Sequence, residues 1–318
     1  MFAYYQYFLV LAEECNISRA SERLYITHQN LSHYLSRLES ELGVTLFERK
    51  PVLSLTYEGK LLYDTLRQVE TLEQNLRAQY ADLHEDRGGE VRLGTTEGRF
   101  RILMPDLMSE FKQEYPDVQL SITSATSPEL SEMVLNNQLD LAILGMPSKP
   151  NRMLSYTEVL QEKLYLVVSD NMLREHFGAD YPACKEELRG GADLRLFQDV
   201  PFALNMPYFN SHLLIDRHLE TLGITLRCVH TSSHPDLHHM MSLRDYAASF
   251  CLTMYLPALL RLNEENGGVL NVFPIKDFTA RNSVVVCCLQ NRVLPNHTKA
   301  LLRMIRKRCG QFSQYDLI

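Results

Sequence analysis

A run of polar side chains between residues 27 and 37 has the chemistry needed to recognise base edges in DNA. The amides of Gln29 and Asn30 can pair with adenine, and His33 can donate a hydrogen bond to guanine. The hydroxyls of Thr27 and Ser32 can bind a phosphate or a base. Taken alone, such residues are most often a solvated helix face. The secondary structure predicted around these residues distinguishes between the two interpretations.

Three short helices are predicted around these residues. Apolar residues recur at helical spacing from Tyr4 to Cys15, and Ser18 is a candidate N-cap for a second helix that ends near Leu24. Thr27 can cap a third helix, which stops at Gly43. A short helix, a tight turn and a third helix with a polar face form a helix-turn-helix, whose last helix enters the major groove. This pattern favours the DNA-binding interpretation.

The next segment predicts a wing and a long helix. Two extended runs, residues 44–47 and 53–55, flank Arg49-Lys50-Pro51 and indicate a small wing beside the DNA backbone. From Tyr57 to about Leu83, apolar residues recur every three or four positions with charged residues between them, as in a helix that pairs with a partner helix. The glycine pair at 88–89 ends this helix and forms a hinge.

Beyond Glu90, strands and helices alternate, which predicts βαβ units over a mostly parallel sheet. We expect a first lobe over about residues 89–160 and 268–318, and a second over about 161–267, joined by two crossovers. The strand Leu270–Phe273 is thereby assigned to the first lobe. A cleft between two lobes is a usual place for a small ligand.

Composition limits the function classes. The chain has 318 residues, of which 45% are hydrophobic and 22% charged, so two or three folding units are expected. A net charge of −7 argues against a protein that binds nucleic acid through overall positive charge alone, so any DNA binding must come from a local surface. Because no apolar window of about 18 residues and no secretory-type start is present, we expect a cytoplasmic protein without a membrane partner.

Histidines and cysteines offer other chemistry. A metal hypothesis is suggested by His234, His238 and His239, with His230 nearby, because His234 and His238 are one helical turn apart. No cysteine or carboxylate completes a ligand set at the usual spacing, so exposed helix histidines or an effector contact are the favoured interpretation. The seven cysteines are never spaced C-x-x-C and are expected to be mostly buried. We therefore predict no metal or other cofactor.

Several segments, taken in order, resemble the LysR family of transcriptional regulators, closely over about the first 60 residues and more loosely beyond. Residues 18–24 are similar to that family's second helix, and Leu31-Ser32 with residues 38–43 resemble its third. Residues 46–49 and 55–59 are similar to its wing and the start of its linker. The family often has Gln-Pro where this chain has His28-Gln29, so no operator sequence is implied.

The resemblance implies an α/β architecture in three parts. These are a winged helix-turn-helix over residues 1–60, a linker and dimerisation helix with its hinge over 57–88, and a two-lobed effector domain over 89–318 that is similar to periplasmic binding proteins. The implied DNA-binding residues are Ser18, Arg19, Thr27, His28, Gln29, Ser32, His33, Arg37, Arg49 and Lys50.

The resemblance also implies a ligand site where the two lobes meet. Hydroxyls and backbone amides at helix starts suit an anion such as a carboxylate. The alternative is that these serines and threonines only cap helices. The implied effector-binding residues are Thr95, Thr96, Ser124, Thr126, Ser127, Asn205, Ser232 and Ser233.

The expected partners follow from the same resemblance: double-stranded DNA, a small-molecule effector, RNA polymerase, and further copies of the chain in a dimer or tetramer. Two other classes remain as rivals, an enzyme or a transport-type binding protein built on the two-lobed domain. Neither class explains an N-terminal helix-turn-helix, and no G-x-G-x-x-G, H-E-x-x-H or G-x-S-x-G motif supports catalysis. A regulator with a degenerate sensor, responding to a protein or to nothing, is a third possibility. The prediction is a regulator and not an enzyme.

Overall fold

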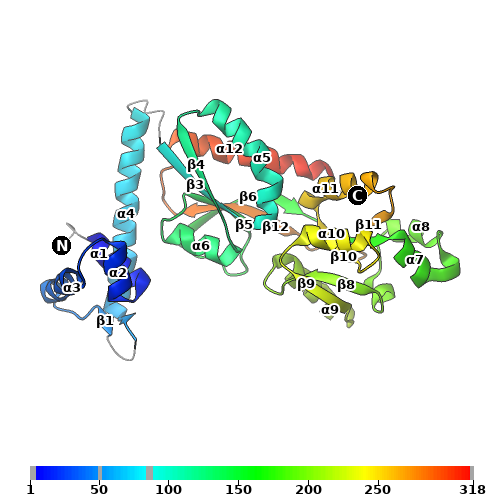
Figure 1. Cartoon of the computed structure of the whole chain (residues 1–318), viewed down its shortest axis with the longest axis horizontal. Helices are drawn as coiled ribbons and strands as arrows, with labels where there is room; N and C mark the ends of the chain where they lie inside the picture. The colour runs from blue at the N-terminus through cyan, green and yellow to red at the C-terminus, as the bar shows by residue number, and fades with distance from the viewer. Residues whose placement is uncertain (1–4, 49–51, 84–88, 316–318) are drawn as a thin grey trace. The chain divides into compact units, whose positions relative to one another are not determined.

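The structure is a computed structural model that describes residues 5–48, 52–83 and 89–315, except for the side chains at 74, 77–79 and 81–83 (Figure 1). The chain divides into two compact units. The first comprises residues 1–85 with 292–294, and the second comprises residues 86–291 with 295–318. None of the described helices is long and apolar enough to cross a membrane.

The first unit begins with three helices, α1 (Tyr5–Glu14), α2 (Ile17–Arg23) and α3 (His28–Leu42). Thr27 caps α3 as predicted, because its hydroxyl accepts the Asn30 N–H at 3.2 Å. Gly43 ends α3 with a left-handed φ of 71°. The predicted cap of α2 is wrong: Asn16 and not Ser18 caps this helix, through an Arg19 N–H to Asn16 Oδ1 bond of 3.1 Å. Asparagine caps helices as well as serine does.

The wing strands are shorter than predicted. They are β1 (Phe47–Glu48) and β2 (Ser54–Leu55), paired antiparallel, and α4 (Tyr57–Leu83) follows with its predicted bounds. A side chain adds to the backbone pairing just before β1: the Glu39 carboxylate accepts the Leu46 N–H at 2.7 Å, while the Leu46 carbonyl accepts the Thr56 N–H at 3.0 Å. Arg49 and Lys50 lie outside the described residues.

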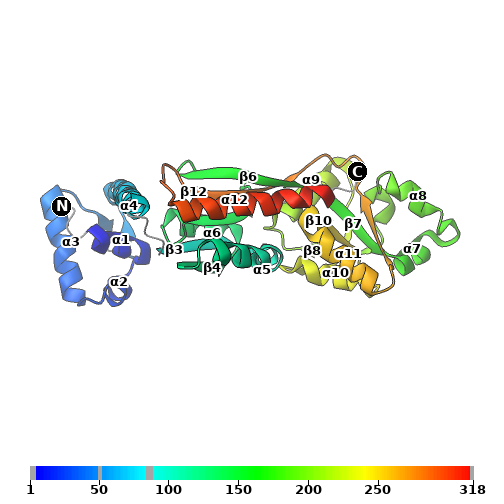
Figure 2. The ribbon, with the colours of Figure 1, turned by 90° about the horizontal axis from the view of Figure 1, so that it is seen from above.

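The first lobe of the second unit is a five-stranded sheet with helices on both faces. Its strand order is β4-β3-β5-β12-β6. Helix α6 packs on one face, and α5 and α12 lie side by side on the other (Figures 1 and 2). The bounds are β3 (Gly89–Thr95), α5 (Glu97–Glu114), β4 (Val118–Ser124), α6 (Ser127–Leu135), β5 (Leu141–Gly145), β6 (Leu154–Glu162), β12 (Asn282–Leu289) and α12 (Asn296–Gln311).

The prediction of a mostly parallel sheet holds for only part of this lobe. Strand β3 is parallel to β4 and β5, but β12 is antiparallel to both β5 and β6. The reason is the path of the chain. Strand β5 ends at Gly145 and β12 begins beside it, with Val284 opposite Gly145, because the chain returns from the second lobe at this same edge.

The second lobe contains two small sheets. Strand β7 pairs antiparallel with β10 and β11, and β8 pairs parallel with β9. The strands are β7 (Leu164–Ser169), β8 (Pro201–Asn205), β9 (Arg227–Ser232), β10 (Ser249–Leu252) and β11 (Leu270–Pro274). The helices are α7 (Asp170–Phe177), α8 (Cys184–Arg189), α9 (Asn210–Leu222), α10 (Pro235–Leu243) and α11 (Leu256–Glu265), and the 3-10 helices of the unit are η2 (Gly178–Asp180), η3 (Leu194–Phe197), η4 (Thr253–Tyr255) and η5 (Phe312–Tyr315).

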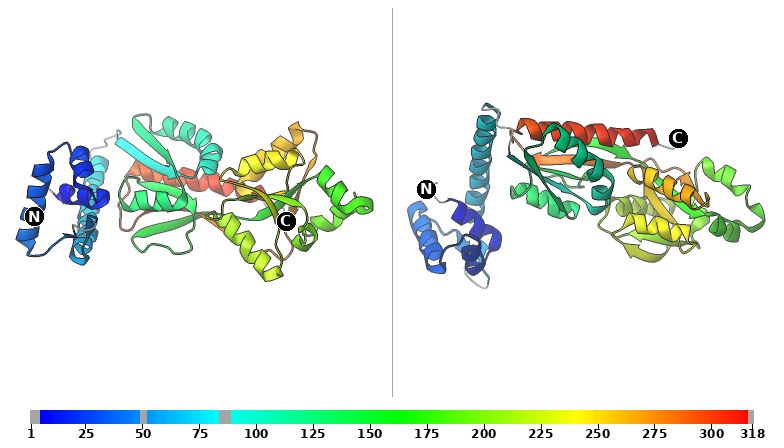
Figure 3. Two further views of the ribbon diagram at one scale, coloured as in Figure 1. Left: turned by 60° about the horizontal axis from the view of Figure 1, so that its bottom comes forward. Right: turned by 45° about the horizontal axis from the view of Figure 1, so that its top comes forward.

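The predicted place of Leu270–Phe273 in the first lobe is wrong. These residues form β11, which pairs with β7 along its whole length and places Leu270 in the same buried core cluster of the second lobe as Tyr165 and Val167. The chain does pass between the lobes twice, as predicted, at Lys163 and between Pro274 and Asn282 (Figure 3). Both passages leave the first lobe at the same place, because Glu162 and Asn282 are register partners.

Candidate DNA-binding surface and effector cleft

Helix α3 separates a buried apolar stripe from an exposed polar one. Leu31, Leu35 and Leu38 are at most 4% exposed and pack into the core of the helix-turn-helix. The polar residues follow the opposite spacing, at 28, 29, 32, 33, 36 and 37. Among the implied DNA-binding residues of this segment, Thr27, His28, Gln29, His33 and Arg37 are exposed and Ser32 is half-buried. The helix therefore presents one continuous hydrogen-bonding surface.

The charges around α3 are partly compensated. Ser18 and Arg19 are exposed on α2, but Arg19 donates to the Glu14 carbonyl at 3.1 Å and lies 3.6 Å from the Glu14 carboxylate. Arg23 pairs with Glu13 at 2.6 Å. In the part of the chain that the structure describes, Arg37 has no such acidic partner. Arg37 is thus the most available positive charge on the polar face of α3.

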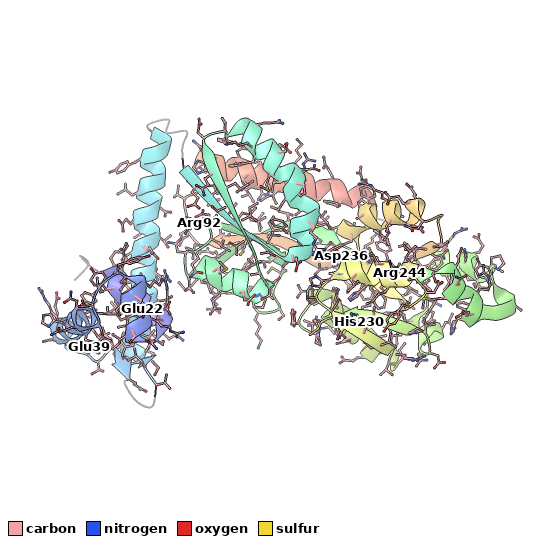
Figure 4. All side chains as sticks on the ribbon, viewed as in Figure 1. Glu22, Glu39, Arg92, His230, Asp236 and Arg244 are labelled. Carbon is pink, nitrogen blue, oxygen red and sulfur yellow. The ribbon has the colours of Figure 1, made fainter. Side chains whose placement is uncertain are left out.

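Two glutamates labelled in Figure 4 show how acidic side chains are distributed here. Glu39 lies on α3, but its carboxylate accepts the Leu46 N–H and so stabilises the start of the wing. Glu22 lies on α2 and is exposed. An acidic group near DNA repels phosphate, so binding by one copy must rely on hydrogen bonds and on helix N-termini.

Helix α4 is anchored to the helix-turn-helix by a buried arginine. Arg67 is 6% exposed, contacts Glu13, and donates to Glu70 at 2.7 Å and to the Tyr63 hydroxyl at 3.1 Å. Tyr5 donates to Glu73 at 2.7 Å, and burial raises the pKa of Tyr5 to about 12. Another face of α4 remains uncovered. Its large apolar residues with 48–81% exposure are Tyr57, Leu61, Leu72, Leu76 and Tyr80.

A cleft of about 750 Å³ lies between the two lobes of the second unit. Six of the eight implied effector-binding residues line it: Thr96, Ser124, Thr126, Ser127, Asn205 and Ser233. The other two point elsewhere. Thr95 is fully buried on β3, and Ser232 bonds to His238 Nε2 at 2.8 Å. The volume suits a small organic molecule.

Some of these lining hydroxyls are already occupied. The Thr126 hydroxyl donates to the Glu129 carboxylate at 2.6 Å, at the start of α6, which agrees with the capping alternative for this residue. The Thr96 hydroxyl accepts from Arg99 Nη1 at 3.3 Å. Asn205 donates from Nδ2 to the Ser211 hydroxyl at 2.8 Å, and its side-chain oxygen Oδ1 is buried without a hydrogen-bond partner among the described residues.

The floor of the cleft contains residues that the sequence analysis missed. Arg99 and Asn282 line the cleft, and Glu162 lies behind them with its side chain fully buried. Glu162 Oε2 accepts from Asn282 Nδ2 at 2.6 Å and from Arg99 Nη2 at 3.5 Å. Burial raises the pKa of Glu162, and the adjacent Arg99 charge opposes that shift. The available signal was the N-terminus of α5: the helix begins at Glu97, so Arg99 lies in its first turn.

Several polar contacts connect the two lobes, including one of 3.7 Å between Glu97 on α5 and His234 before α10. Arg101 on α5 bonds at 2.6 Å to Asp236 on α10, which is labelled in Figure 4, and at 2.7 Å to Glu97. Asn210 on α9 donates to the Met146 carbonyl at 3.1 Å. A change in the lobe arrangement must break or reshape these contacts.

The histidines of the second lobe differ from the expectation of exposed side chains. His238 and His239 are 1% and 3% exposed, and burial lowers the pKa of each to about 4. His230, labelled in Figure 4, is half-buried beside His238, with ring centroids 6.0 Å apart. Among the residues that the structure describes, no group of three or more His, Cys, Asp or Glu side chains could hold a metal ion.

Comparison with known proteins identifies both parts of the chain. Residues 2–60 match the family described as "Bacterial regulatory helix-turn-helix protein, lysR family", and residues 84–310 match the "LysR substrate binding domain". The regulator YtlI of Bacillus subtilis is 33% identical over 133 residues, which cover 41% of this chain and 42% of YtlI. CysB of Haemophilus influenzae is 29% identical over 136 residues, which cover 42% of each chain. The matches thus span about half of these curated relatives or less.

Solved structures share the fold over nearly the whole chain. Full-length OxyR of Pseudomonas aeruginosa has a TM-score of 0.62 at 20% identity, covering 95% of this chain and 92% of OxyR. Full-length CbnR in complex with its target DNA has a TM-score of 0.52 at 18% identity, covering 95% of this chain and 97% of CbnR. With family matches over 2–60 and 84–310, the chain belongs to the LysR family.

Proposed function

We propose that this chain is a sequence-specific DNA-binding transcriptional regulator, and not an enzyme, whose activity a small molecule modulates from the cleft. The observation that carries the proposal is α3, a capped helix after a tight turn whose polar face is exposed while its leucines are buried. Side chains on such a face read base edges in the major groove. In this proposal His28, Gln29, Ser32 and His33 read bases, and Arg37 binds phosphate.

The proposal includes pairing of two chains through α4. Its exposed apolar residues, among them Leu61, Leu72 and Leu76, are the kind of surface that a second helix covers. A dimer would present two α3 helices to a pseudo-palindromic site, and further assembly through the effector domains would give a tetramer. Because residues 1–60 carry seven glutamates, affinity must come from such avidity more than from attraction to phosphate.

In this proposal the three parts of the chain have separate roles. Residues 1–60 bind DNA, 57–88 pair the chains, and 89–318 bind the effector. Binding in the cleft favours one lobe arrangement, which alters the spacing of the DNA-bound pairs and the access of RNA polymerase in the cytoplasm. The size of this shift is limited by the ligand's differential affinity for the two arrangements. A solved effector domain of QuiR in complex with shikimate, with a TM-score of 0.55 at 16% identity, supports a small ligand here.

A selection experiment tests the DNA-binding part. The purified chain is incubated with fragmented genomic DNA at fixed salt, and bound fragments are sequenced. We expect enrichment of a common motif with two half-sites about 10 base pairs, or a multiple, apart. Enrichment without any shared motif would contradict sequence-specific reading. Repeating the selection with a ligand that stabilises the chain tests the sensor. If the sensor is degenerate, the same fragments should be bound with and without that ligand.

A further inference from the structure

The effector cleft extends beyond the junction of the two lobes, because it follows helix α6 of the first lobe. The residues of α6 that line the cleft recur on one face of the helix, from its first residue to its last: 127, 128, 131, 132 and 135, with 129 beside them. From Ser127 to Leu135 the helix rises about 12 Å, at about 1.5 Å per residue. The cleft therefore runs along the whole of α6.

The connection between β5 and β6 lines the same cleft. Its lining residues are 147–149 and Asn151, and Tyr156 on β6 lines the cleft as well. These residues belong to the first lobe, as α6 does. We call the part of the cleft that is lined by these residues and by α6 the α6 arm. It is distinct from the part lined by both lobes.

Part of the lining of the α6 arm is the edge of the first lobe's apolar core. Ala125, Leu135 and Tyr156 are half-buried, line the cleft and pack against one buried cluster, which includes Leu130 and Val134 of α6. This shared cluster places Leu135 and Tyr156 on the same side of the sheet. An apolar surface that is exposed in a cleft favours a ligand that removes it from water.

Several polar side chains of the arm already have hydrogen-bond partners within the first lobe. The Ser131 hydroxyl donates to a carbonyl of its own helix at 3.0 Å, and the Tyr156 hydroxyl accepts the Asn151 N–H at 3.2 Å. These groups therefore need no polar group from a ligand. Glu132 and Lys149 are exposed, so water can solvate their charges. The arm thus offers a ligand mainly apolar contact.

We propose, on the basis of the proposed effector role of this cleft, that the effector is an elongated amphipathic molecule. Its polar end lies at the lobe junction, near the helix starts at Thr96 and Asn210, and its apolar part lies in the α6 arm. Both ends fit, because a cleft of about 750 Å³ is within the range that holds drug-sized ligands. Each methylene group buried in the arm should raise the affinity about fourfold.

Ser131 determines how much room the arm offers. It lies about one helical turn after Ser127 and one turn before Leu135, in the middle of the face of α6 that lines the cleft. Its side chain is small, so the space beside it remains open to a ligand. A larger apolar side chain at this position would occupy that space without removing a bond to another element, because the Ser131 hydroxyl bonds only within α6.

Two series of compounds test the proposal on the full-length wild-type chain. We would measure the melting temperature with butanoate, hexanoate, octanoate and decanoate, and with the corresponding primary alcohols, each below the concentration at which it forms micelles. A ligand that binds only the folded state raises stability by mass action. We expect stabilisation to increase with chain length in at least the series whose polar end suits the lobe junction, and to level off once the chain fills the arm.

A matched pair of variants tests the place where the chain binds. Ser131→Phe fills the arm, so the longest compound should bind about tenfold more weakly or worse, because it loses the burial of several methylene groups. The shortest compound that binds should keep its affinity. The control is Ser109→Phe on α5 of the same lobe, an exposed position outside the cleft lining. This control should reproduce the wild-type dependence on chain length.

The outcomes separate this inference from the proposed function. Equal stabilisation by short and long compounds, or equal affinity for the longest compound in Ser131→Phe and Ser109→Phe, would overturn the assignment of the α6 arm and leave the lobe junction as an effector site. Stabilisation by no compound of either series would overturn the inference and count against the effector role, while DNA reading is tested separately by selection. If Ser131→Phe does not fold, the smaller Ser131→Leu takes its place in the same comparison.

Discussion

The buried His238 ring makes the stability of the effector domain depend on pH. The ring is 1% exposed, and burial lowers its pKa from 6.5 to about 4. Above pH 6.5 the ring is neutral in both the folded and the unfolded chain, so it has no effect. As the pH falls from 6.5 towards 4, only the unfolded chain takes up the proton, and folding loses stability. Linkage gives a loss of about 2 kcal/mol at pH 5 and about 3 kcal/mol at pH 4.

Replacing His238 by Gln removes this titrating group. Urea unfolding of the wild-type chain and of His238→Gln, each at pH 7 and pH 5, measures the difference. The wild type should lose about 2 kcal/mol more than the variant between the two pH values. Ser232→Ala is the control, because it removes the 2.8 Å bond to His238 but leaves the ring buried, so its pH dependence should remain. An equal loss in the wild type and His238→Gln would refute the reasoning.

Three further substitutions have defined outcomes. Thr27→Ala removes the cap of α3 and should lower the free energy of unfolding, measured with urea, by about 1 kcal/mol. Thr27→Ser keeps a capping hydroxyl and should therefore keep most of that stability. Equal stability of the two variants would contradict the cap. Gly43→Ala should lower the free energy of unfolding by about 1 kcal/mol in the same assay. The loss comes from the positive φ alone, because a Cβ at this position meets nothing within 4 Å. Gly43→Asn should recover part of the lost stability, because asparagine tolerates a positive φ better than alanine does. Gly98→Ala would place a Cβ 2.0 Å from the Tyr255 hydroxyl, so it should lower the melting temperature, and Tyr255→Phe should relieve part of that effect; additive losses would contradict this contact.

The first unit could be predicted well because its signals are local. The Thr27 cap, the left-handed Gly43 and the leucine stripe of α3 each depend on residues within a few positions. The cap of α2 was misplaced because Asn16 and Ser18 are both good capping residues, and only the backbone geometry distinguishes them. The short wing strands depend on a longer contact, from Glu39 to Leu46.

The effector unit could be predicted only in outline. The placement of β11 failed because an apolar run such as Leu270–Phe273 fits a strand in either lobe, and its pairing with β7 joins residues about one hundred positions apart. The cleft floor was missed for the same reason. Arg99, Glu162 and Asn282 come from three distant segments, and their polar types have meaning only once the two crossovers bring them together. Local hydroxyls such as Thr96 were found because they follow strands directly.

The measurement that tests the central claim most directly is a footprint of the purified chain on the DNA upstream of its own gene, at fixed salt. The wild type is compared with the double variant Ser32→Ala/His33→Ala, and with Ser109→Ala, an exposed serine on α5, as the control. Circular dichroism confirms that each variant is folded. We predict that the wild type and the control protect the same bases and that the double variant loses this protection. Protection of the same bases by the double variant, at the same protein concentration, would contradict the claim that α3 reads DNA.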